Sequence, residues 1–332
     1  MTVSRRPLLT ARRRTASAVA ALGAAALLLT GCGSDSGADR AKGDGKDAAA
    51  SGTRTVKDAT GKVVEVPANP QRIVTLTQED LDAVLALKIK PVGITNGQGL
   101  DEPPAYLAGK VKGIDIVGGL LKPVMDKVVA ARPDLILAGD MQDEQVLKQL
   151  REITPATLVT MAPTDDWKMS FRGIGNAVNK LGDANKVIAD HEAAAKKAGE
   201  KLGAGKGAAV SIVRWNPDGP SWMEKKQFAS GVALEMGLQR PANQNKDGNA
   251  HAPSLSLEKI NEIDGDWLFL STLTADGEKA LKDVQTKPAY KELGAVKKGH
   301  VVTVNGSVWS TRGGPLASDV VMSDISKALS GA

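Results

Sequence analysis

The side chains best suited to catalysis or metal binding are few and widely separated in this sequence. The 332 residues include one cysteine, Cys32, and three histidines, His191, His251 and His300. A single thiol allows neither an intramolecular disulfide nor a thiolate metal cluster. The sequence contains no GxSxG nucleophile motif and no HExxH zinc motif. We therefore expect no enzymatic activity, no resident cofactor and no metal held by protein side chains. We expect His191 to face solvent on a helix.

Cys32 follows a segment that is typical of an exported lipoprotein. Residues 1–31 contain five arginines, no lysine and no acid, with an uncharged run at Thr15–Leu29. A run of about 15 residues is shorter than the roughly 20 that a membrane-spanning helix needs. The sequence Leu29-Thr30-Gly31-Cys32 resembles the lipobox of bacterial lipoproteins, in which the cysteine is lipidated and becomes the new N-terminus. We expect a signal peptide at 1–31 and a lipid on Cys32 that anchors the chain to the outer face of the cell membrane.

The arginines of the leader bear on the export route, and the composition of residues 32–54 bears on how the leader is connected to the folded part. Ser4-Arg5-Arg6-Pro7-Leu8-Leu9 resembles a twin-arginine export signal. A second arginine run at 12–14 fits a general basic leader equally well, so both export routes stay open. Residues 32–54 consist mostly of Gly, Ser, Ala, Asp and Lys, a composition with almost nothing to bury. They are predicted to form a flexible tether.

The net charge of +5 belongs to the leader. Removing its five arginines from the 43 basic residues leaves 38, equal to the 38 acidic residues. A neutral body without a basic block argues against a nucleic-acid partner. The hydrophobic content of 42% is enough for buried cores and excludes global disorder.

From Arg72 onward, short apolar runs alternate with helical patterns, which favours α/β lobes with largely parallel sheets. One long helical stretch is predicted at Trp167–Leu181, broken at Gly182-Asp183 and resuming over Ala184–Leu202. The predicted fold is α/β, with two α/β lobes joined by a single long helix and a ligand cleft between the lobes. The predicted boundaries are an N-terminal lobe at 55–183, an interlobe helix at 184–204 and a C-terminal lobe at 205–332. The predicted strands are 73–76, 92–94, 135–138, 157–160, 208–215, 267–271 and 301–304, and the other predicted helices are 78–87, 124–131, 144–153, 231–236, 277–284, 288–293 and 316–329.

Several segments together identify a family resemblance that extends from about Val63 to Leu329. They are RIVTL, KPVGIT, VVAARPDLILA, SLSLEKINEIDGDWLFL, AVKKGHVVTV and WSTRGGPLASDVVMSDI. Their order and spacing resemble the solute-binding lipoproteins of ABC importers for iron–siderophores, cobalamin and haem. The segment SIVRWNPDGPSWMEKKQFASGVALEMGLQRP is most similar to iron(III)–siderophore binders of actinobacteria.

The resemblance implies a ligand whose metal is already coordinated by its chelator. Such a ligand needs aromatic and apolar surface, and a cation that hydrogen-bonds the chelating oxygens. Each candidate has an alternative, because an arginine can pair with a surface acid and an aromatic side chain can pack into a core. The candidate ligand contacts are Arg214, Trp215, Trp222, Trp309, Arg312 and Tyr106.

Two acids are candidates for docking to a permease. The resemblance assigns this role to one acid at the start of a helix in each lobe, here Asp126 and Glu258. Both could instead be first-turn acids favoured by the helix dipole. In the first lobe, the loop at Gly119–Lys122 lacks the arginine that some hydroxamate-binding relatives carry, so we expect apolar contact there and assign the arginine role to Arg214.

The sequence thus predicts a monomeric, lipid-anchored, extracytoplasmic receptor that captures an Fe(III)–siderophore and delivers it to an ABC permease driven by a cytoplasmic ATPase. A hydroxamate siderophore is expected first, because it needs fewer cationic partners than a catecholate. The alternatives are cobalamin or haem as ligand, a lipid-anchored hydrolase, or an adhesion module without an interlobe cleft. Sparse histidines, with Tyr106 and Tyr290 the only tyrosines, make axial haem ligation unfavourable.

Overall fold

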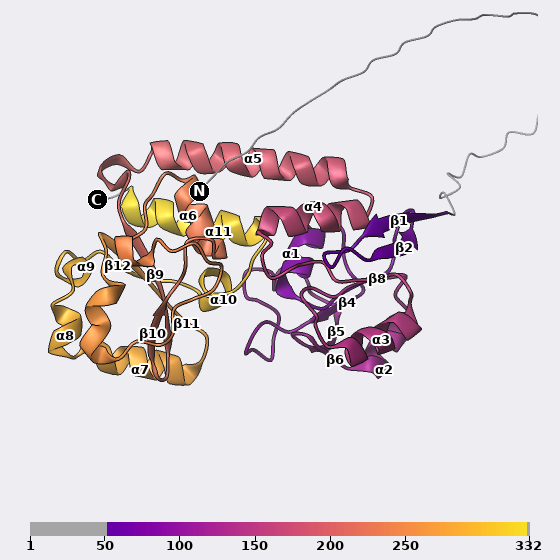
Figure 1. Ribbon diagram of the computed structural model, residues 1–332, viewed down its shortest axis with the longest axis horizontal. Helices are drawn as coiled ribbons and strands as arrows, with labels where there is room; N and C mark the ends of the chain where they lie inside the picture. The colour runs from indigo at the N-terminus through magenta and orange to yellow at the C-terminus, as the bar shows by residue number, and fades with distance from the viewer. Residues whose placement is uncertain (1–51, 331–332) are drawn as a thin grey trace, which may run out of the picture. The chain divides into compact units, whose positions relative to one another are not determined.

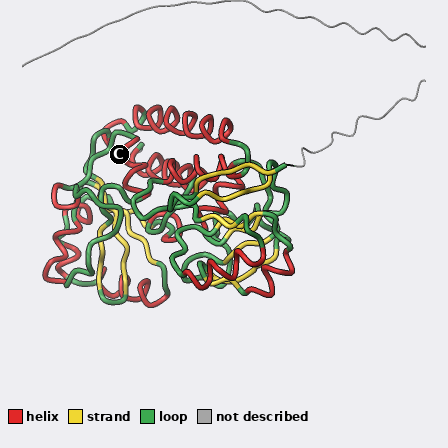
Figure 2. The backbone as a smooth tube through the Cα atoms, turned by 45° about the vertical axis from the view of Figure 1, so that its right-hand side comes forward, coloured by secondary structure: helices red, strands yellow, loops and turns green. Residues whose placement is uncertain are grey.

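The structure of the chain is a computed structural model, and it describes residues 52–330. The predicted signal peptide, the predicted lipidation site at Cys32 and nearly all of the expected tether lie outside the described residues. Within 52–330, two separate sheets of mostly parallel strands are each covered by helices, as predicted. Figures 1 and 2 show the two groups of strands side by side, with α5 passing over both. None of the helices in the described residues is long and apolar enough to cross a membrane.

The first lobe is built on a six-stranded sheet with the order β6-β5-β4-β3-β7-β8, in which only the β5–β6 pair is antiparallel. Ile73 and Leu135 face the core under α1 and α4, while Val74 and Ile136 face the core under α2 and α3. This alternation is what a pleated strand imposes when both faces are covered. The elements are β3 (Ile73–Thr75), α1 (Gln78–Ala86), β4 (Gly93–Thr95), β5 (Asp115–Gly119), β6 (Lys122–Pro123), α2 (Met125–Ala131), β7 (Leu135–Leu137), α3 (Glu144–Ile153), β8 (Thr157–Leu158) and α4 (Trp167–Ala177).

The second lobe has a four-stranded sheet with the order β10-β9-β11-β12, in which only β10 is antiparallel. Helices α6 and α11 pack on one face, and α7, α8 and η3 pack on the other. The strands are β9 (Val210–Asn216), β10 (Gly219–Trp222), β11 (Trp267–Thr272) and β12 (Val301–Thr303). The helices are α6 (Phe228–Glu235), α7 (Ala275–Gln285), α8 (Pro288–Lys291), α9 (Gly294–Lys297), α10 (Gly306–Trp309) and α11 (Pro315–Leu329), with 3₁₀ turns η1 (Gly203–Gly205), η2 (Ala242–Gln244) and η3 (Leu257–Ile263).

A small antiparallel hairpin precedes the first lobe and corrects the expected end of the tether. It consists of β1 (Thr53–Lys57) and β2 (Val63–Pro67). Val56, Val64 and Val66 alternate along it and bury their side chains in the core beneath α1 and α4. Residues 53 and 54, which were expected to belong to the tether, therefore lie in a strand.

The long helix between the lobes is α5 (Leu181–Glu200). The predicted break at Gly182-Asp183 is wrong, because α4 ends at Ala177 and α5 begins at Leu181. The break falls at Asn179, whose φ of 57° is left-handed, a conformation that asparagine tolerates better than most residues. Asp183 instead lies in the first turn of α5, where a negative charge is favourable. Figure 1 shows α5 passing α4 at one end and α6 and α11 at the other.

Helix α1 of the first lobe contacts the start of α11 directly. The carboxylate of Asp82 accepts hydrogen bonds from the backbone N–H groups of Leu316 and Ala317, at 2.9 and 2.8 Å. It also accepts one from the hydroxyl of Tyr106, at 2.9 Å. Burial raises the pKa of Asp82 to about 6, although these three hydrogen bonds act in the opposite direction. Asp82 therefore caps a helix that lies apart from its own by more than 230 residues of sequence.

We predict that Asp82→Ala lowers the free energy of unfolding by roughly 2–4 kcal/mol, because it leaves two buried N–H groups and a hydroxyl without an acceptor. Tyr106→Phe removes one of the three hydrogen bonds and is expected to cost roughly 1 kcal/mol. Urea unfolding of both variants measures the difference. Equal costs for the two variants would contradict the capping role.

Candidate ligand-binding site

A pocket of about 820 Å³ lies between the two lobes. In the first lobe its walls come from segments that follow the carboxyl ends of β3, β4, β5 and β7, including Thr77, Gln98, Leu120 and Asp140. In the second lobe they come from the end of β9, the β10–α6 segment and the loop before α11. The carboxyl edge of a parallel sheet is where open α/β folds bind ligands.

Arg214 is the predicted cation, and it lines this pocket. Its Nε donates to Oδ1 of Asn216 at 3.0 Å, and its Nη2 lies 2.6 Å from Nε2 of His251. Because Nδ1 of His251 lies 2.9 Å from the carbonyl oxygen of Ala252, the proton is assigned to Nδ1, which leaves Nε2 to accept from Arg214. Burial lowers the pKa of Arg214, and the charge of Asp218 acts in the opposite direction. The guanidinium is therefore held in place by neutral acceptors, with no ion pair to a carboxylate among residues 52–330.

Three further cations line the second-lobe wall. Arg312, also a predicted contact, lies in the loop before α11 and is half-buried against the sulfur of Met161 from the first lobe. Lys225 and Lys226 precede α6 and were not predicted. Lys225 is 3.5 Å from an exposed carboxylate, that of Asp247, whereas no ion pair to Lys226 is found in the described part of the chain. The wall thus presents cationic groups to the pocket.

The first-lobe wall carries acids as well as the expected apolar contacts. Leu120 and Leu121 do line the pocket, as predicted from the Gly119–Lys122 loop. Glu79, at the start of α1, and Asp140, after β7, line it as well. Burial raises the pKa of Glu79 to about 7, with smaller contributions from neighbouring charges.

The remaining surface of the pocket is largely apolar. Phe228 begins α6, Met223 follows β10, and Met161 lies in the segment before α4. Trp167 is half-buried and lines the pocket with Phe171. Aromatic and thioether side chains adapt well to a large, rounded organic ligand.

Two of the predicted tryptophan contacts belong to the core of the second lobe. Trp215 is 2% exposed and Trp222 is 4% exposed, and both pack beneath α7 and η3. Arg214 and Trp215 are consecutive residues of β9, so their side chains must point to opposite faces of the sheet. Since Arg214 enters the pocket, Trp215 cannot do so. The expectation of a ligand contact from both residues is wrong, and Trp222 pairs with Val213 on the same buried face as Trp215.

Trp309 and Tyr106 also have structural partners. Trp309 is fully buried, stacks on Phe269 with ring centroids 4.6 Å apart, and donates its indole N–H to Asp324 at 3.0 Å. Tyr106 packs between the lobes with its hydroxyl on Asp82. Neither residue lines the pocket, so the structure corrects both expectations of ligand contact.

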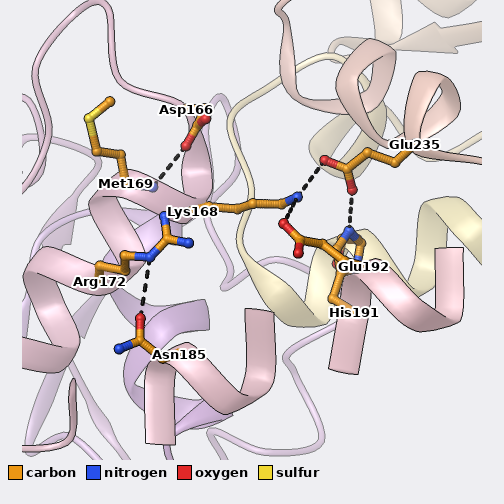
Figure 3. A network of polar contacts seen from close by, with 9 residues as sticks. Asp166, Lys168, Met169, Arg172, Asn185, His191, Glu192 and Glu235 are labelled. Atoms are coloured by element: carbon orange, nitrogen blue, oxygen red, sulfur yellow. Dashed lines mark hydrogen bonds and ion pairs between the residues drawn. The ribbon is translucent and has the colours of Figure 1, made fainter. Parts of the chain in front are cut away.

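At one end of the pocket, a polar network connects three helices (Figure 3). Nζ of Lys168 on α4 lies 2.8 Å from Glu192 on α5 and 2.7 Å from Glu235 on α6. His191 on α5 contacts the other oxygen of Glu235 at 2.6 Å and is only 5% exposed, so its expected solvation is wrong. Trp167 packs edge-on against the His191 ring. Burial raises the pKa of Glu235, but the contacts with His191 and Lys168 outweigh it and leave that pKa below its ordinary value.

The two predicted docking acids lie on the surface, one in each lobe. Asp126 is exposed in the first turn of α2, as predicted, and Glu258 is exposed in the first turn of η3. Apolar side chains beside them are also exposed, with Val124 at 47% and Leu257 at 47%. No cluster of three or more His, Cys, Asp or Glu residues suited to a metal is found within 52–330.

The buried position of Trp309 leads to a test. Trp309→Ala is expected to lower the free energy of unfolding by roughly 3–5 kcal/mol, the range for truncating a large core side chain. Trp309→Phe keeps an aromatic ring on Phe269 and is expected to leave the affinity of the pocket for its ligand unchanged. Chemical unfolding and ligand titration of Trp309→Phe check this. Weaker binding at unchanged stability would restore Trp309 as a ligand contact.

Comparison with known proteins places this architecture in a family. Residues 73–307 match the Periplasmic binding protein family. A probable siderophore-binding lipoprotein of Bacillus subtilis is 33% identical over 312 residues, covering 91% of this chain and 94% of that protein. An Fe(3+)-citrate-binding protein of the same organism is 27% identical, covering 91% of this chain and 93% of that protein.

Solved structures show the same fold. SirA of Staphylococcus aureus, complexed with staphyloferrin B, superimposes with a TM-score of 0.74 at 24% identity, covering 83% of this chain and 98% of that one. FeuA of Bacillus subtilis, complexed with ferri-bacillibactin, gives a TM-score of 0.69 at 24% identity, covering 84% and 98%. With two sheet-based lobes, a connecting helix and a pocket between them, the chain belongs to the periplasmic binding protein family.

Proposed function

We propose that this chain is the extracytoplasmic substrate-binding component of an ABC importer, which binds a ferric siderophore and delivers it to a permease driven by a cytoplasmic ATPase. The observation that carries the proposal is the interlobe pocket of about 820 Å³, whose apolar lining is combined with the guanidinium of Arg214, which contacts Asn216 and His251 and forms no ion pair within residues 52–330. Its volume suits a ligand of several hundred daltons. A chelate that already saturates its iron needs hydrogen-bond donors and apolar surface from the protein rather than metal ligands.

A hydroxamate siderophore is the ligand class we propose first. Arg214 and Arg312 supply donors for electron-rich chelating oxygens. Glu79 and Asp140 on the opposite wall would repel the high negative charge of a tris-catecholate complex. The second candidate is a citrate-type ferric complex, favoured by Lys225 and Lys226 in the same wall as the arginines and by the similarity to a protein named for ferric citrate.

The rest of the assignment concerns location and mode of action. We propose that lipidated Cys32 holds the receptor at the outer face of the cell membrane, after export by the general or the twin-arginine route. The chain acts as a monomer and catalyses no reaction. Arg214 and Arg312 contact the ligand, and Asp126 and Glu258 dock onto the permease. These two acids and the exposed Val124 and Leu257 give each lobe a charged and an apolar contact point.

The ligand assignment is tested by titrating the unlipidated protein with ferrioxamine B, ferrichrome, ferric citrate, haemin and cobalamin while following tryptophan fluorescence. We expect quenching by the two hydroxamate complexes at micromolar concentration. Arg214→Ala is expected to weaken their binding by roughly 1–3 kcal/mol, because a charged donor is lost. Arg172→Ala, at an exposed site on α4, is the matched control and should bind like the wild type.

The outcomes separate the two parts of this proposal. Quenching by ferric citrate alone would replace the hydroxamate class with the second candidate. Quenching by none of the five ligands would remove the siderophore assignment, and an unchanged affinity in Arg214→Ala would remove Arg214 from the site.

The docking proposal predicts a separation of binding from uptake. Asp126→Ala and Glu258→Ala should bind the ligand with wild-type affinity, because both acids lie outside the pocket, yet reduce iron uptake by cells that rely on this receptor. Glu144→Ala and Asp276→Ala remove exposed first-turn acids from α3 and α7 and serve as controls. Equal uptake by all four variants would indicate that Asp126 and Glu258 only complement helix dipoles.

A further inference from the structure

The two walls of the pocket differ in charge. The second-lobe wall contributes Arg214, Lys225, Lys226 and Arg312, and its one acid, Glu235, is held by Lys168 and His191. The acids of the first-lobe wall are Glu79, Asp140, Asp165 and Asp166, while its one cation, Lys168, is paired with two carboxylates. An uncharged, symmetrical ligand would gain nothing from this arrangement.

Most acids near this wall are already engaged. Asp165 accepts a hydrogen bond from the backbone N–H of Ala162, and Asp166 caps α4 by accepting from that of Met169. On α1, Asp80 accepts from the hydroxyls of Thr77 and Thr160, at 2.8 and 2.5 Å. Asp82, described above, has three donors. These carboxylates are occupied in holding the fold together.

Glu79 differs from its neighbours on α1. It lies between Gln78 and Asp80, and its side chain lines the pocket. No side chain in residues 52–330 donates a hydrogen bond to its carboxylate, and no cation lies within ion-pair distance of it. Burial raises its pKa to about 7. Glu79 is half-buried, and its own backbone N–H is the one hydrogen-bond donor that acts on its pKa. A partly buried carboxylate with so few donors is unfavourable in the empty protein, so a ligand that supplies a further donor gains from it.

We propose that Glu79 is a specificity-determining residue that accepts a hydrogen bond from a protonated amine on the ligand, while the chelate end of the same ligand lies against Arg214 and Arg312. The inference rests on the proposed function and specifies its ligand: a ferric siderophore that carries an ammonium group away from its iron centre. An ammonium supplies three donors and one positive charge, which match a carboxylate on the first-lobe wall that has no side-chain donor and no cationic partner among residues 52–330.

Glu79 is a better acceptor than Asp140 for two reasons. Burial is the largest influence on the pKa of Glu79, so an ion pair there is less screened by solvent than one at the surface. Asp140 also raises the pKa of Glu79 through like charge, so a cation bound at Glu79 relieves both its burial cost and this repulsion.

The test uses two ligands that differ in one charge. Ferrioxamine B carries a terminal ammonium, and its N-acetylated form has the same ferric chelate but no charge at that end. Wild-type protein should bind ferrioxamine B about tenfold more tightly than the acetylated form, the effect of one charge-assisted hydrogen bond. Glu79→Gln should lose this preference and keep its affinity for the acetylated form. The retained affinity for the acetylated form would also show that the variant is folded.

Control variants show which carboxylate produces the preference for ferrioxamine B. Glu144→Gln removes an acid whose side chain is 84% exposed on α3 and should keep the preference of the wild type. If Asp140→Asn loses the preference and Glu79→Gln keeps it, the assignment to Glu79 is wrong. If wild type and Glu79→Gln bind both ligands equally, the ammonium site is refuted although the siderophore function stands. Binding of neither ligand would instead refute the hydroxamate assignment on which the inference rests.

The pH dependence gives a second measurement. Because the pKa of Glu79 is about 7, its carboxyl is mostly charged at pH 8 and mostly neutral at pH 5.5 in the empty protein, whereas an alkylammonium stays protonated throughout. The charged groups that act on Glu79 are Asp80, Asp140 and Arg312. The preference for ferrioxamine B should be several-fold larger at pH 8 than at pH 5.5 in the wild type. A preference that does not change with pH would contradict the role of Glu79.

Discussion

Helix α1 buries carboxylates, and much of the structure supplies their partners. Asp80 is held by Thr77 at the start of its own helix and by Thr160 beyond β8. Asp82 is held by the first N–H groups of α11 and by Tyr106. A buried carboxylate without donors would cost several kcal/mol, so these contacts fix how α1 lies against the loops of its own lobe and against α11. The position of the pocket wall follows, because Glu79 directly precedes Asp80 and lies three residues before Asp82 on the same helix.

The junction between the lobes has more than one connection. Besides Asp82, Nε2 of Gln78 donates to the carbonyl oxygens of Ser307 and Arg312, at 2.7 and 3.1 Å. At the other end of the pocket, Lys168 bridges α4, α5 and α6. A large rotation of one lobe would break these buried polar contacts or bend α5, and both cost energy. The structure therefore favours small adjustments around a largely preformed pocket.

The sequence was sufficient for the fold class, for seven of the twelve strands in the described residues and for placing Arg214 at the end of a strand beside the pocket, because hydrophobic periodicity and strand ends are local features. The strands β1, β2, β5, β6 and β10 were not predicted. The tryptophans were harder to place. The alternation along β9 already excluded Arg214 and Trp215 from the same face, but the direction of Trp309 depends on its stacking with Phe269, which is distant in sequence. Glu79 could have been found from its position just after β3, at the carboxyl edge of the sheet. That no side chain in the described residues donates to its carboxylate is a property of tertiary structure alone.

The opposite charges of the two pocket walls have a consequence for the direction of transport. A field across a binding site gives a polar ligand one orientation of lowest energy. Each bound molecule then presents the same end to the mouth of the pocket, and the permease meets a ligand whose orientation is already chosen. The ligand can therefore be selected twice, through different parts of its surface. The receptor recognises the two ends that contact the pocket walls, and the permease can then recognise the surface that the receptor leaves exposed.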